Sequence, residues 1–384
     1  MRVLMNAGPW LPVPPGGYGG IENVVATLVP PLRALGVEVV LATVGASTLP
    51  ADGRVTVFED GQFAALQRPY NQVSGVAQAH LHGVVRALRS GLDVDLVHDH
   101  VEAAGLATVA ALGLPALHTL HWDLGKHPEL YGTFDGGGRV WVNGVSAAQL
   151  ARAPQALRDH AIGHVHLATP LADGADRRPL PAKGDHVVIL GRITPGKGQD
   201  LGARLAHEYG FDLVLAGPVG PHHSASSLVL DSDNPDVRFF RSSVAPYVDG
   251  VRVRWLGTVA PPFRDELVGT ARAMLAPLRW EEPGGTFVVE SLALGTPVVA
   301  LARGCLPELV EHGRTGLLTS AEEELPDLLH AADKIDPREC AKEAAARFTP
   351  SVMATHYLSL YKRVLNSPPP ASPRLDSKGQ PLGA

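Results

Sequence analysis

The sequence predicts an α/β protein of two doubly wound domains, each a parallel sheet covered by helices on both faces. Its 384 residues exceed what a single hydrophobic core comfortably holds. Short runs of consecutive apolar residues alternate with helical stretches, which is typical of strands buried on both faces. This series stops at the polar, proline-rich stretch "ATPLADGADRRPLPAKGD" and then begins again. We therefore expect two similar units in succession.

The first series opens with a strand-loop-helix-strand unit. The strand "RVLMNAG" leads into the loop "PWLPVPPGGYGG", the helix "IENVVATLVPPLRALG" and the strand "VEVVLAT". Further strands are expected in "VDLVHDH", "PALHTLH" and "RVWVNGVS", and a helix in "VAQAHLHGVVRALRSG". Pro30 and Pro31 fall inside the first helix, where a missing amide and a steric clash predict a break or kink.

The second series contains five apolar strands, "DHVVILGRI", "FDLVLAGPV", "VRVRWLGTV", "RAMLAPL" and "TPVVALA". A further helix is expected in "PSVMATHYLSLYKRVL", and the tail "NSPPPASPRLDSKGQPLGA" has the composition of a disordered segment. The predicted organisation is a first domain at 1–170, a linker at 171–185, a second domain at 186–348, a helix at 349–365 and a disordered tail at 366–384.

The composition excludes several classes of protein. Hydrophobic residues make up 45% and charged residues 19%, and no apolar run approaches the ~20 residues that span a bilayer. The net charge of −6 argues against a nucleic-acid partner, which requires clustered lysine and arginine. The first residues do not form a signal peptide, and the two cysteines build no disulfide framework. A cytoplasmic location is therefore expected.

The stretch "RWEEPGGTFVVESLALG" directs attention to two acids. "RWEEPGG" leaves the carboxyl end of a strand, where open α/β sheets bind ligands, and its glycines expose a helix N-terminus that attracts anions. Glu290 lies on the helix beside apolar neighbours, so its carboxylate should meet a ligand hydroxyl or buried donors. The alternatives are that Glu282 only complements the helix dipole and that Glu290 pairs with an internal base.

Glu282 and Glu290, with seven residues between them, resemble the E-x7-E motif of retaining GT-B glycosyltransferases, and the chain is similar to glycosyltransferase family 4 (glycosyl transferases group 1). The likeness runs from "GGYGGIENVVATL" through "VVILGRITPGKGQDL" to about residue 365. It implies the GT-B fold, in which two Rossmann-like domains face a cleft that binds a nucleotide sugar. Residues 1–170 would then be the acceptor domain and 186–348 the donor domain, with the C-terminal helix crossing back onto the first.

The resemblance also implies roles for the donor-domain residues. Glu282 would contact hydroxyls of the donor sugar, and Glu290 would bind the ribose. Gly285 and Thr286 would offer backbone amides to the diphosphate.

Other matching residues are expected to complete the site. Arg192 and Lys197, in "GRITPGKG", match a basic pair that holds the diphosphate, and a glycine-containing loop after a strand suits such cations. The plain alternative is that both are loop charges. Gly19 and Gly20 would face the phosphates from the first domain, and His121 would contact the donor sugar near its reacting carbon.

A dinucleotide cofactor and a zinc ion both fit the sequence poorly. The dinucleotide fingerprint G-x-G-x-x-G fails in "GGYGGIE", where Glu22 stands at the last glycine position. A zinc site built from His98, His100, His118 and His121 would need four converging ligands, which the spacing does not establish. The resemblance implies no metal and no other cofactor. It leaves the roles of the first three histidines open.

The expected activity is transfer of a hexosyl unit from a nucleoside-diphosphate sugar to an acceptor hydroxyl, with retention at the anomeric carbon. The resemblance implies front-face attack without a covalent intermediate. Residues 1–150 contain eight Lys or Arg against twelve Asp or Glu, a net charge of −4 that would not attract an anionic membrane. A soluble small molecule or saccharide is therefore the expected acceptor. A lipid or polysaccharide acceptor, a GT-B sugar-nucleotide epimerase and a non-catalytic sugar-nucleotide-binding protein remain as alternatives.

Overall fold

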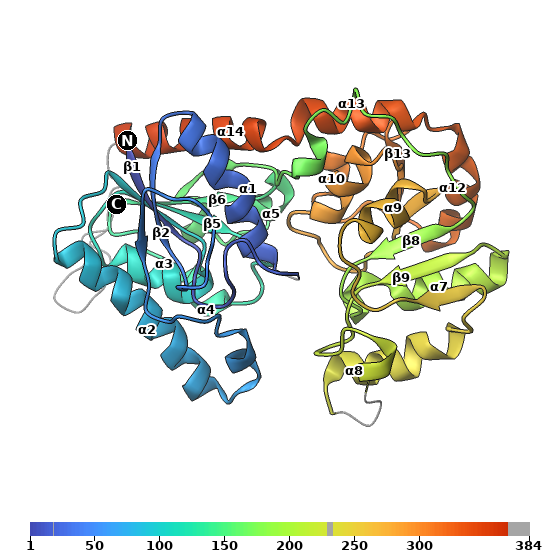
Figure 1. Ribbon diagram of the computed structural model, residues 1–384, viewed down its shortest axis with the longest axis horizontal. Helices are drawn as coiled ribbons and strands as arrows, with labels where there is room; N and C mark the ends of the chain where they lie inside the picture. Colours follow the sequence, from blue (N-terminus) through green and yellow to red (C-terminus); the bar gives the residue numbers. More distant parts are fainter. Residues whose placement is uncertain (18, 229–232, 368–384) are drawn as a thin grey trace. The chain divides into compact units, whose positions relative to one another are not determined.

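The computed structural model describes residues 1–17, 19–228 and 233–367, and the chain forms two compact units. One unit combines Met1–His166 with the chain from Ser351 onward, and the other is Leu167–Pro350. Residues 171–185, expected as a linker, belong to the second unit, and Ala172 is fully buried in its core. The expected disordered tail lies outside the described residues except for Asn366 and Ser367. Figure 1 shows a sheet with flanking helices in each unit.

The first unit contains a seven-stranded sheet in which every strand pair is parallel. Its strands, in the spatial order β3-β2-β1-β4-β5-β6-β7, are β1 (Arg2–Asn6), β2 (Glu38–Ala42), β3 (Gly53–Val55), β4 (Leu96–Asp99), β5 (Ala116–Leu120), β6 (Val140–Gly144) and β7 (Ala161–His164). Its helices are α1 (Gly20–Ala34), α2 (Tyr70–Arg89), α3 (Glu102–Ala110), α4 (Pro128–Gly132), α5 (Ala147–Ala151), α6 (Gln155–Arg158) and α14 (Pro350–Asn366).

Helix α1 runs through Pro30 and Pro31 without a break, so of the expected break or kink the break does not occur. The two prolines remove amides that would bond to the carbonyls of Ala26 and Thr27. Both of these residues are half-exposed, so water can reach them. The last turn closes beyond the prolines, where the Leu35 amide donates to the carbonyl of Pro31 over 3.0 Å.

The second unit contains a six-stranded parallel sheet. Its strands, in the spatial order β10-β9-β8-β11-β12-β13, are β8 (Val187–Leu190), β9 (Leu213–Ala216), β10 (Val253–Trp255), β11 (Ala273–Ala276), β12 (Val298–Leu301) and β13 (Gly316–Thr319). Its helices are α7 (Gln199–Tyr209), α8 (Pro235–Phe239), α9 (Phe263–Gly269), α10 (Thr286–Ala293), α11 (Leu306–Leu309), α12 (Leu325–Ala331) and α13 (Pro337–Arg347). Two doubly wound parallel sheets confirm the predicted fold class.

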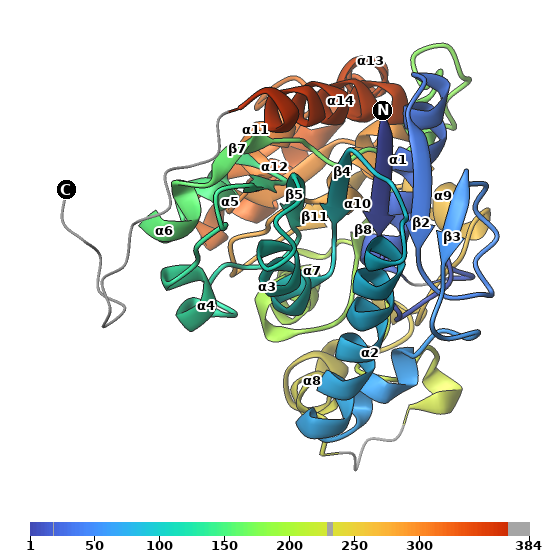
Figure 2. The same ribbon diagram turned by 90° about the vertical axis from the view of Figure 1, so that its left-hand side faces the viewer.

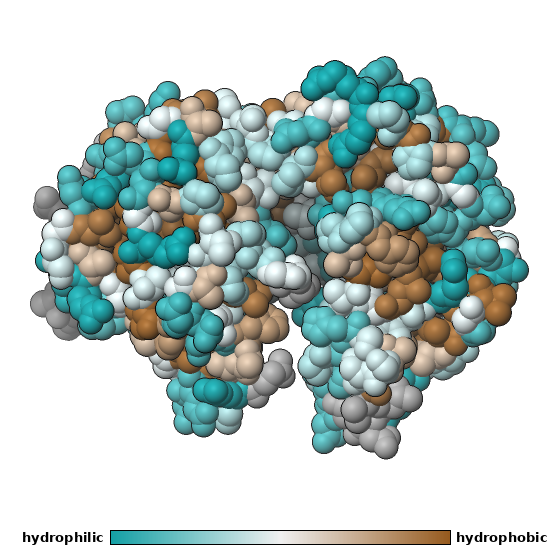
Figure 3. All heavy atoms as spheres, viewed as in Figure 1, coloured by the Kyte–Doolittle hydropathy of each residue, from teal (hydrophilic) through white to brown (hydrophobic). Residues whose placement is uncertain are grey.

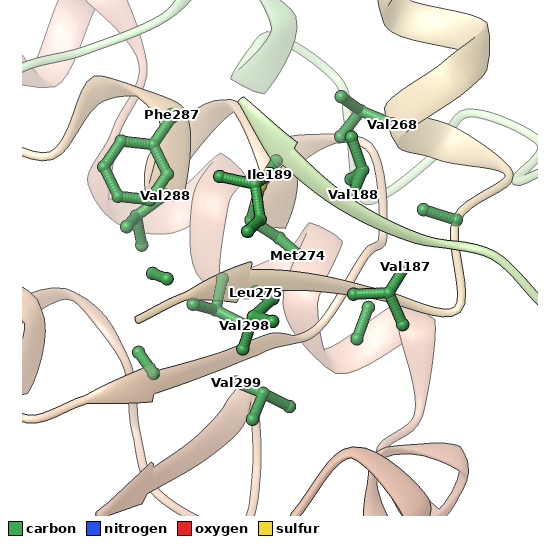
Figure 4. Packing of buried hydrophobic residues seen from close by; sticks show 14 of the residues in the cluster. Val187, Val188, Ile189, Val268, Met274, Leu275, Phe287, Val288, Val298 and Val299 are labelled. Atoms are coloured by element: carbon green, nitrogen blue, oxygen red, sulfur yellow. The ribbon is translucent and has the colours of Figure 1, made fainter. Parts of the chain in front are cut away.

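The core of the second unit is built from consecutive apolar residues on the central strands. Figure 4 shows side chains of β8, β11 and β12 packed with those of α9 and α10. Phe287 and Val288, at the start of α10, lie beside Ile189 of β8. The N-terminal turn of α10 is therefore anchored to the sheet by burial of apolar side chains.

Both sheets reverse their strand order beside the first strand of the unit. In the first unit the chain winds outward through β1, β2 and β3 and then returns to β4 on the other side of β1. In the second unit β11 returns beside β8 in the same way. Ligands of doubly wound sheets bind at the carboxyl ends of the strands at such switch points. The loops that leave β8 and β11 carry Arg192, Lys197, Glu282 and Gly285 of the predicted site.

A tight turn at Gly285 begins α10. Gly285 has a left-handed backbone, with φ of 57°. A Cβ atom on this residue would lie 2.8 Å from Cδ1 of Leu309 and 3.0 Å from Sγ of Cys305. Both the dihedral angle and the close approach therefore require glycine.

Helix α14 packs on the sheet of the first unit through two buried tyrosines. The Tyr361 hydroxyl lies 2.7 Å from Nδ1 of His98 in β4, and Nε2 of His98 lies 2.8 Å from Oγ1 of Thr119 in β5. The Tyr357 hydroxyl lies 3.3 Å from the same Oγ1 atom and 3.4 Å from Nδ2 of Asn143. Figure 2 shows α14 alongside this unit's strands.

In the described part of the chain, no helix combines the length and apolar character needed to cross a membrane. The visible face of each unit mixes hydrophilic and hydrophobic residues (Figure 3).

Replacing Tyr361 by phenylalanine should destabilise the first unit. Thr119 donates its hydroxyl hydrogen to Asn143, so His98 donates to Thr119 through Nε2 and accepts from Tyr361 through Nδ1. Tyr361→Phe would leave that nitrogen buried without a partner and lower the free energy of unfolding by about 1–2 kcal/mol. Equilibrium urea unfolding would measure the change.

Tyr357→Phe is the matched control, because its partners Thr119 and Asn143 each keep another hydrogen bond. Tyr357→Phe should lower the free energy of unfolding by less than Tyr361→Phe does. Equal losses for the two variants would contradict the proton assignment at His98.

Gly285→Ala should lower the free energy of unfolding by about 3 kcal/mol, because it combines a left-handed backbone with a steric clash. Gly210→Ala is the control: Gly210 has a similar φ of 74° but no atom within 4 Å of its added Cβ. That variant should cost only about 1 kcal/mol. Urea denaturation of both variants would test the difference, and equal costs would rule out the packing argument.

Candidate functional site

The loops after β8 and β11 bring a lysine and a glutamate together. Lys197 lies in the first loop and Glu282 in the second, and Nζ of the lysine is 2.5 Å from Oε2 of the glutamate. Their side chains are 20% and 10% exposed, respectively. The Coulomb attraction between Lys197 and Glu282 is stronger than that of a pair on an open surface, because water screens a largely buried pair less.

Trp280 holds Glu282 from the other side. The indole Nε1 donates to the same Oε2 atom over 3.0 Å, and Nζ of Lys197 lies 4.8 Å from the centre of the indole ring. Among the described residues, no group is bonded to the second carboxylate oxygen, Oε1. That oxygen can accept hydrogen bonds from a ligand while Oε2 fixes the orientation of the carboxylate.

The N-terminus of α10 supplies an anion-binding group within the same loop. Gly285 is the N-cap residue, and no side chain caps the helix. Within the described residues, no acceptor is bonded to the amides of Gly285, Thr286 or Phe287, and Thr286 is exposed. Aligned amides at a helix start carry roughly half a positive charge. Lys197 lies 5.5 Å from the ring of Phe287, so its charge adds to that of the helix end.

Arg192 occupies the start of the β8 loop and is exposed. Its backbone carbonyl accepts a hydrogen bond from Nε2 of Gln199 over 2.9 Å, which closes the loop around Lys197. Burial raises the pKa of Asp236 above its ordinary value, and the Arg192 charge opposes that rise. Among the described residues, the Arg192 guanidinium forms no ion pair with Glu282, whose partner is Lys197.

Glu290 lies one turn further along α10, away from the lysine pair. Its Oε1 atom is 3.4 Å from Nη1 of Arg264 in α9. Burial raises the pKa of Glu290, Arg264 lowers it and Asp265 raises it again. Of the alternatives set by the sequence, pairing with an internal base is therefore the one observed at Glu290.

The glycine loop of the first unit depends on Gly19 and Glu22. The backbone of Gly19 is extended, and a Cβ atom there would lie 2.7 Å from Cγ of Pro15. Gly20 begins α1 and is exposed. Burial raises the pKa of Glu22 to about 7, and hydrogen bonds from its own amide and that of Leu11 oppose the rise. The residue that interrupts the dinucleotide fingerprint thus ties the loop to the helix start.

His121 follows β5 and is half-buried. Its Nε2 atom lies 2.8 Å from Nδ1 of His100, whose own Nε2 lies 3.1 Å from Sδ of Met5. Burial, followed by the influence of His118, lowers the pKa of His121 to about 3. The ring is therefore neutral near pH 7. If His100 donates to the sulfur atom, His121 donates to His100 and keeps Nδ1 as an acceptor.

His98 and His118 are buried in separate hydrogen-bond networks. Both nitrogens of His98 are engaged by Tyr361 and Thr119, and burial lowers its pKa well below the ordinary value. Nδ1 of His118 lies 2.6 Å from Oδ2 of Asp99. The structure thus gives these two histidines structural partners and does not bring the four histidines together as ligands of one metal.

Two residues of the second unit were missed by the sequence analysis. Trp280 could have been found, because it stands two positions before Glu282 in the same loop. Arg264 carries no such signal, since only the tertiary fold brings α9 beside Glu290. Cys305 is fully buried below the Gly285 turn, and burial raises its thiol pKa well above the ordinary value.

Comparisons with known proteins agree with this arrangement. The family described as "Glycosyl transferases group 1" matches residues 175–345, and "Glycosyltransferase Family 4" matches residues 18–157. The chain is 28% identical over 351 residues to alpha-maltose-1-phosphate synthase of Mycolicibacterium smegmatis, covering 83% of this chain and 84% of that protein. It is 27% identical over 378 residues to phosphatidyl-myo-inositol mannosyltransferase of Mycobacterium leprae, covering 91% and 94%.

Solved structures are similar over nearly the whole chain. AviGT4, a glycosyltransferase involved in avilamycin A biosynthesis, is 27% identical with a TM-score of 0.64, covering 95% of this chain and 98% of that one. Sucrose-phosphate synthase from Thermosynechococcus elongatus shares the fold at 19% identity, with a TM-score of 0.70 and coverage of 94% and 98%. With one family matching each unit, the chain belongs to glycosyltransferase family 4, the group 1 glycosyl transferases of the GT-B fold.

Proposed function

We propose that the protein is a retaining hexosyltransferase that uses a nucleoside-diphosphate sugar and needs no metal ion. The observation that carries the proposal is the pairing of Lys197 with Glu282 beside the uncapped N-terminus of α10. Cation, carboxylate and free amides are the groups that a diphosphate and an adjacent sugar require. They lie on the two loops that leave the switch point of one sheet.

Donor binding would redistribute the lysine pair. A diphosphate carries more negative charge than one carboxylate, so its oxygens would draw Lys197 away from Glu282 or share it. The amides of Gly285 and Thr286 would donate to the same group. Glu282, still held by Trp280, would then accept hydrogen bonds from hydroxyls of the sugar.

Departure of the nucleoside diphosphate would be the step that these groups accelerate. Negative charge grows on the leaving oxygen as the glycosidic bond breaks, and fixed positive groups stabilise that charge most in the transition state. Lys197, Arg192 and the start of α10 would supply this stabilisation in place of a metal. The leaving oxygen would help to deprotonate the acceptor on the same face, which retains the anomeric configuration.

Residues of the first unit would complete the donor site. Neutral His121 would accept a hydrogen bond from a sugar hydroxyl through Nδ1, while Gly19 and Gly20 would allow close approach to the phosphates. Glu290 would bind the ribose. These assignments rest on the family resemblance together with the neutral state of the imidazole.

The proposed acceptor is a soluble small molecule or saccharide. Relatives include a maltose-1-phosphate synthase and an enzyme of avilamycin A biosynthesis, but also a phosphatidyl-myo-inositol mannosyltransferase, whose name specifies a lipid. The net charge of −4 over residues 1–150 favours the soluble class. Sedimentation of the protein with anionic liposomes at low salt would overturn this part of the proposal.

A thermal-shift screen of nucleoside diphosphates tests the donor class. A nucleotide present at 100 times its dissociation constant should stabilise the native protein by about 2.7 kcal/mol. Sugar derivatives of the best nucleotide would then be assayed for slow hydrolysis alone and for transfer with acceptors. Conversion of the donor into an isomeric nucleotide sugar without acceptor would instead identify an epimerase. Failure of every nucleotide to bind would refute the proposal.

Lys197→Ala should reduce kcat by about 100- to 1,000-fold, because the lost charge acts chiefly in the transition state. Lys342→Ala is a suitable control, since Lys342 is an exposed lysine of α13 that pairs with Glu339. Steady-state kinetics with the identified donor would separate kcat from KM. Turnover of Lys197→Ala at a near wild-type rate would show that the Lys197 charge does not stabilise the departing diphosphate.

Trp280→Phe keeps an aromatic side chain at this position but removes the indole N–H that donates to Oε2 of Glu282. We expect kcat to fall about tenfold, the size of one hydrogen bond to a charged group, while affinity for the nucleoside diphosphate changes less than about twofold. Calorimetric binding beside kinetics would measure both quantities. An equal loss of nucleotide affinity would place the effect of Trp280 on the diphosphate instead of the sugar.

A further inference from the structure

Arg264 and Glu290 form a half-buried pair beside the candidate donor site. Their side chains are 24% and 22% exposed, and Nη1 of the arginine lies 3.4 Å from Oε1 of the glutamate. The same guanidinium contacts Oδ1 of Asp265 through Nε at 2.9 Å and Nη2 at 2.8 Å. Two carboxylates thus share one cation, and within the described residues Oε2 of Glu290 has no partner.

The position of Arg264 is not explained by helix stability. It is the second residue of α9, where the partial positive charge of the helix start disfavours a cation. Asp265 and Glu266, in the same turn, have the charge that suits a helix start. An arginine placed against the dipole, with its guanidinium turned toward α10, indicates a role at Glu290.

Arg264 lies close enough to affect the charge of Glu290. Arg264 and Asp265, the two charged groups that act on the Glu290 carboxylate, both come from α9. Burial and Asp265 raise the pKa of Glu290, whereas Arg264 lowers it. Without the guanidinium, the carboxyl group would hold its proton to higher pH.

We propose that Arg264 is a positioning and specificity-determining residue that keeps Glu290 an ionised acceptor for the 2′,3′-diol of a ribonucleoside diphosphate. The proposal rests on the proposed function, because it concerns the ribose of the same donor. The guanidinium lies beside Oε1, so both lone pairs of Oε2 would be available to the ribose hydroxyls. An ionised carboxylate accepts hydrogen bonds from two ribose hydroxyls, whereas a protonated one offers a donor in place of one acceptor.

The experiment compares wild type, Arg264→Met, Arg264→Lys and Glu290→Gln. Each would be titrated by calorimetry with the nucleoside diphosphate found in the screen and with its 2′,3′-dideoxy analogue, from pH 5.5 to 8.5. Arg272→Met is the control, because Arg272 follows α9 and pairs with Asp333. Circular dichroism would confirm that each variant is folded.

Arg264→Met should bind the ribonucleotide about tenfold more weakly at pH 7, the loss of one hydrogen bond to a charged group. Its affinity should increase with pH, because a carboxyl group with a raised pKa becomes an acceptor only as it deprotonates. Arg264→Lys should restore most of the affinity. The dideoxy analogue should bind equally to wild type, Arg264→Met and the Arg272→Met control.

Unchanged ribonucleotide affinity and pH profile in Arg264→Met would overturn the proposal. Equal weakening of the ribo and dideoxy forms would overturn it too, because it would indicate structural damage. Glu290→Gln could lose the difference in affinity between the ribonucleotide and its dideoxy analogue while Arg264→Met keeps it. That result would overturn the role of Arg264 but leave Glu290 as the ribose-binding residue. If the wild-type protein binds no nucleoside diphosphate, the proposed function fails with it.

Discussion

The ion pair of Lys197 with Glu282 joins the two loops that leave the switch point of the second sheet. A lysine and a carboxylate are each costly to bury alone, and the contact between them reduces that cost. The free amides of a helix start lie in the same loop. The arrangement is poised for a larger anion, because the helix amides remain free and the lysine can exchange one anionic partner for another.

The predicted fold followed from features that are local in the sequence. Runs such as "VVIL" and "AMLA" are apolar at every position because parallel strands between helices are buried on both faces. The strands β3, β7 and β13 were not predicted, since each contains a glycine and no more than two consecutive apolar residues. Helix α1 continued through Pro30 and Pro31 because the carbonyls deprived of partners lie at a half-exposed surface, which a propensity argument cannot foresee.

The candidate site was predictable only in part, for a physical reason. Lys197, Glu282 and Gly285 lie in loops at strand ends, so their chemistry can be inferred from chain order and spacing. Arg264 acts through a side-chain contact between two helices, and nothing in its own segment indicates the partner. In the first unit, His98 and His118 resembled site residues in the sequence, yet the fold uses them to satisfy buried polar groups and to dock α14.

The most direct test of the central claim is a crystal structure of the protein with the nucleoside diphosphate that binds it best. We expect diphosphate oxygens within hydrogen-bonding distance of the amides of Gly285 and Thr286 and of Nζ of Lys197. We also expect Nζ of Lys197 to lie further from Oε2 of Glu282 than the present 2.5 Å. A diphosphate bound away from the start of α10, with the Lys197–Glu282 pair intact, would show that these groups do not form the diphosphate site.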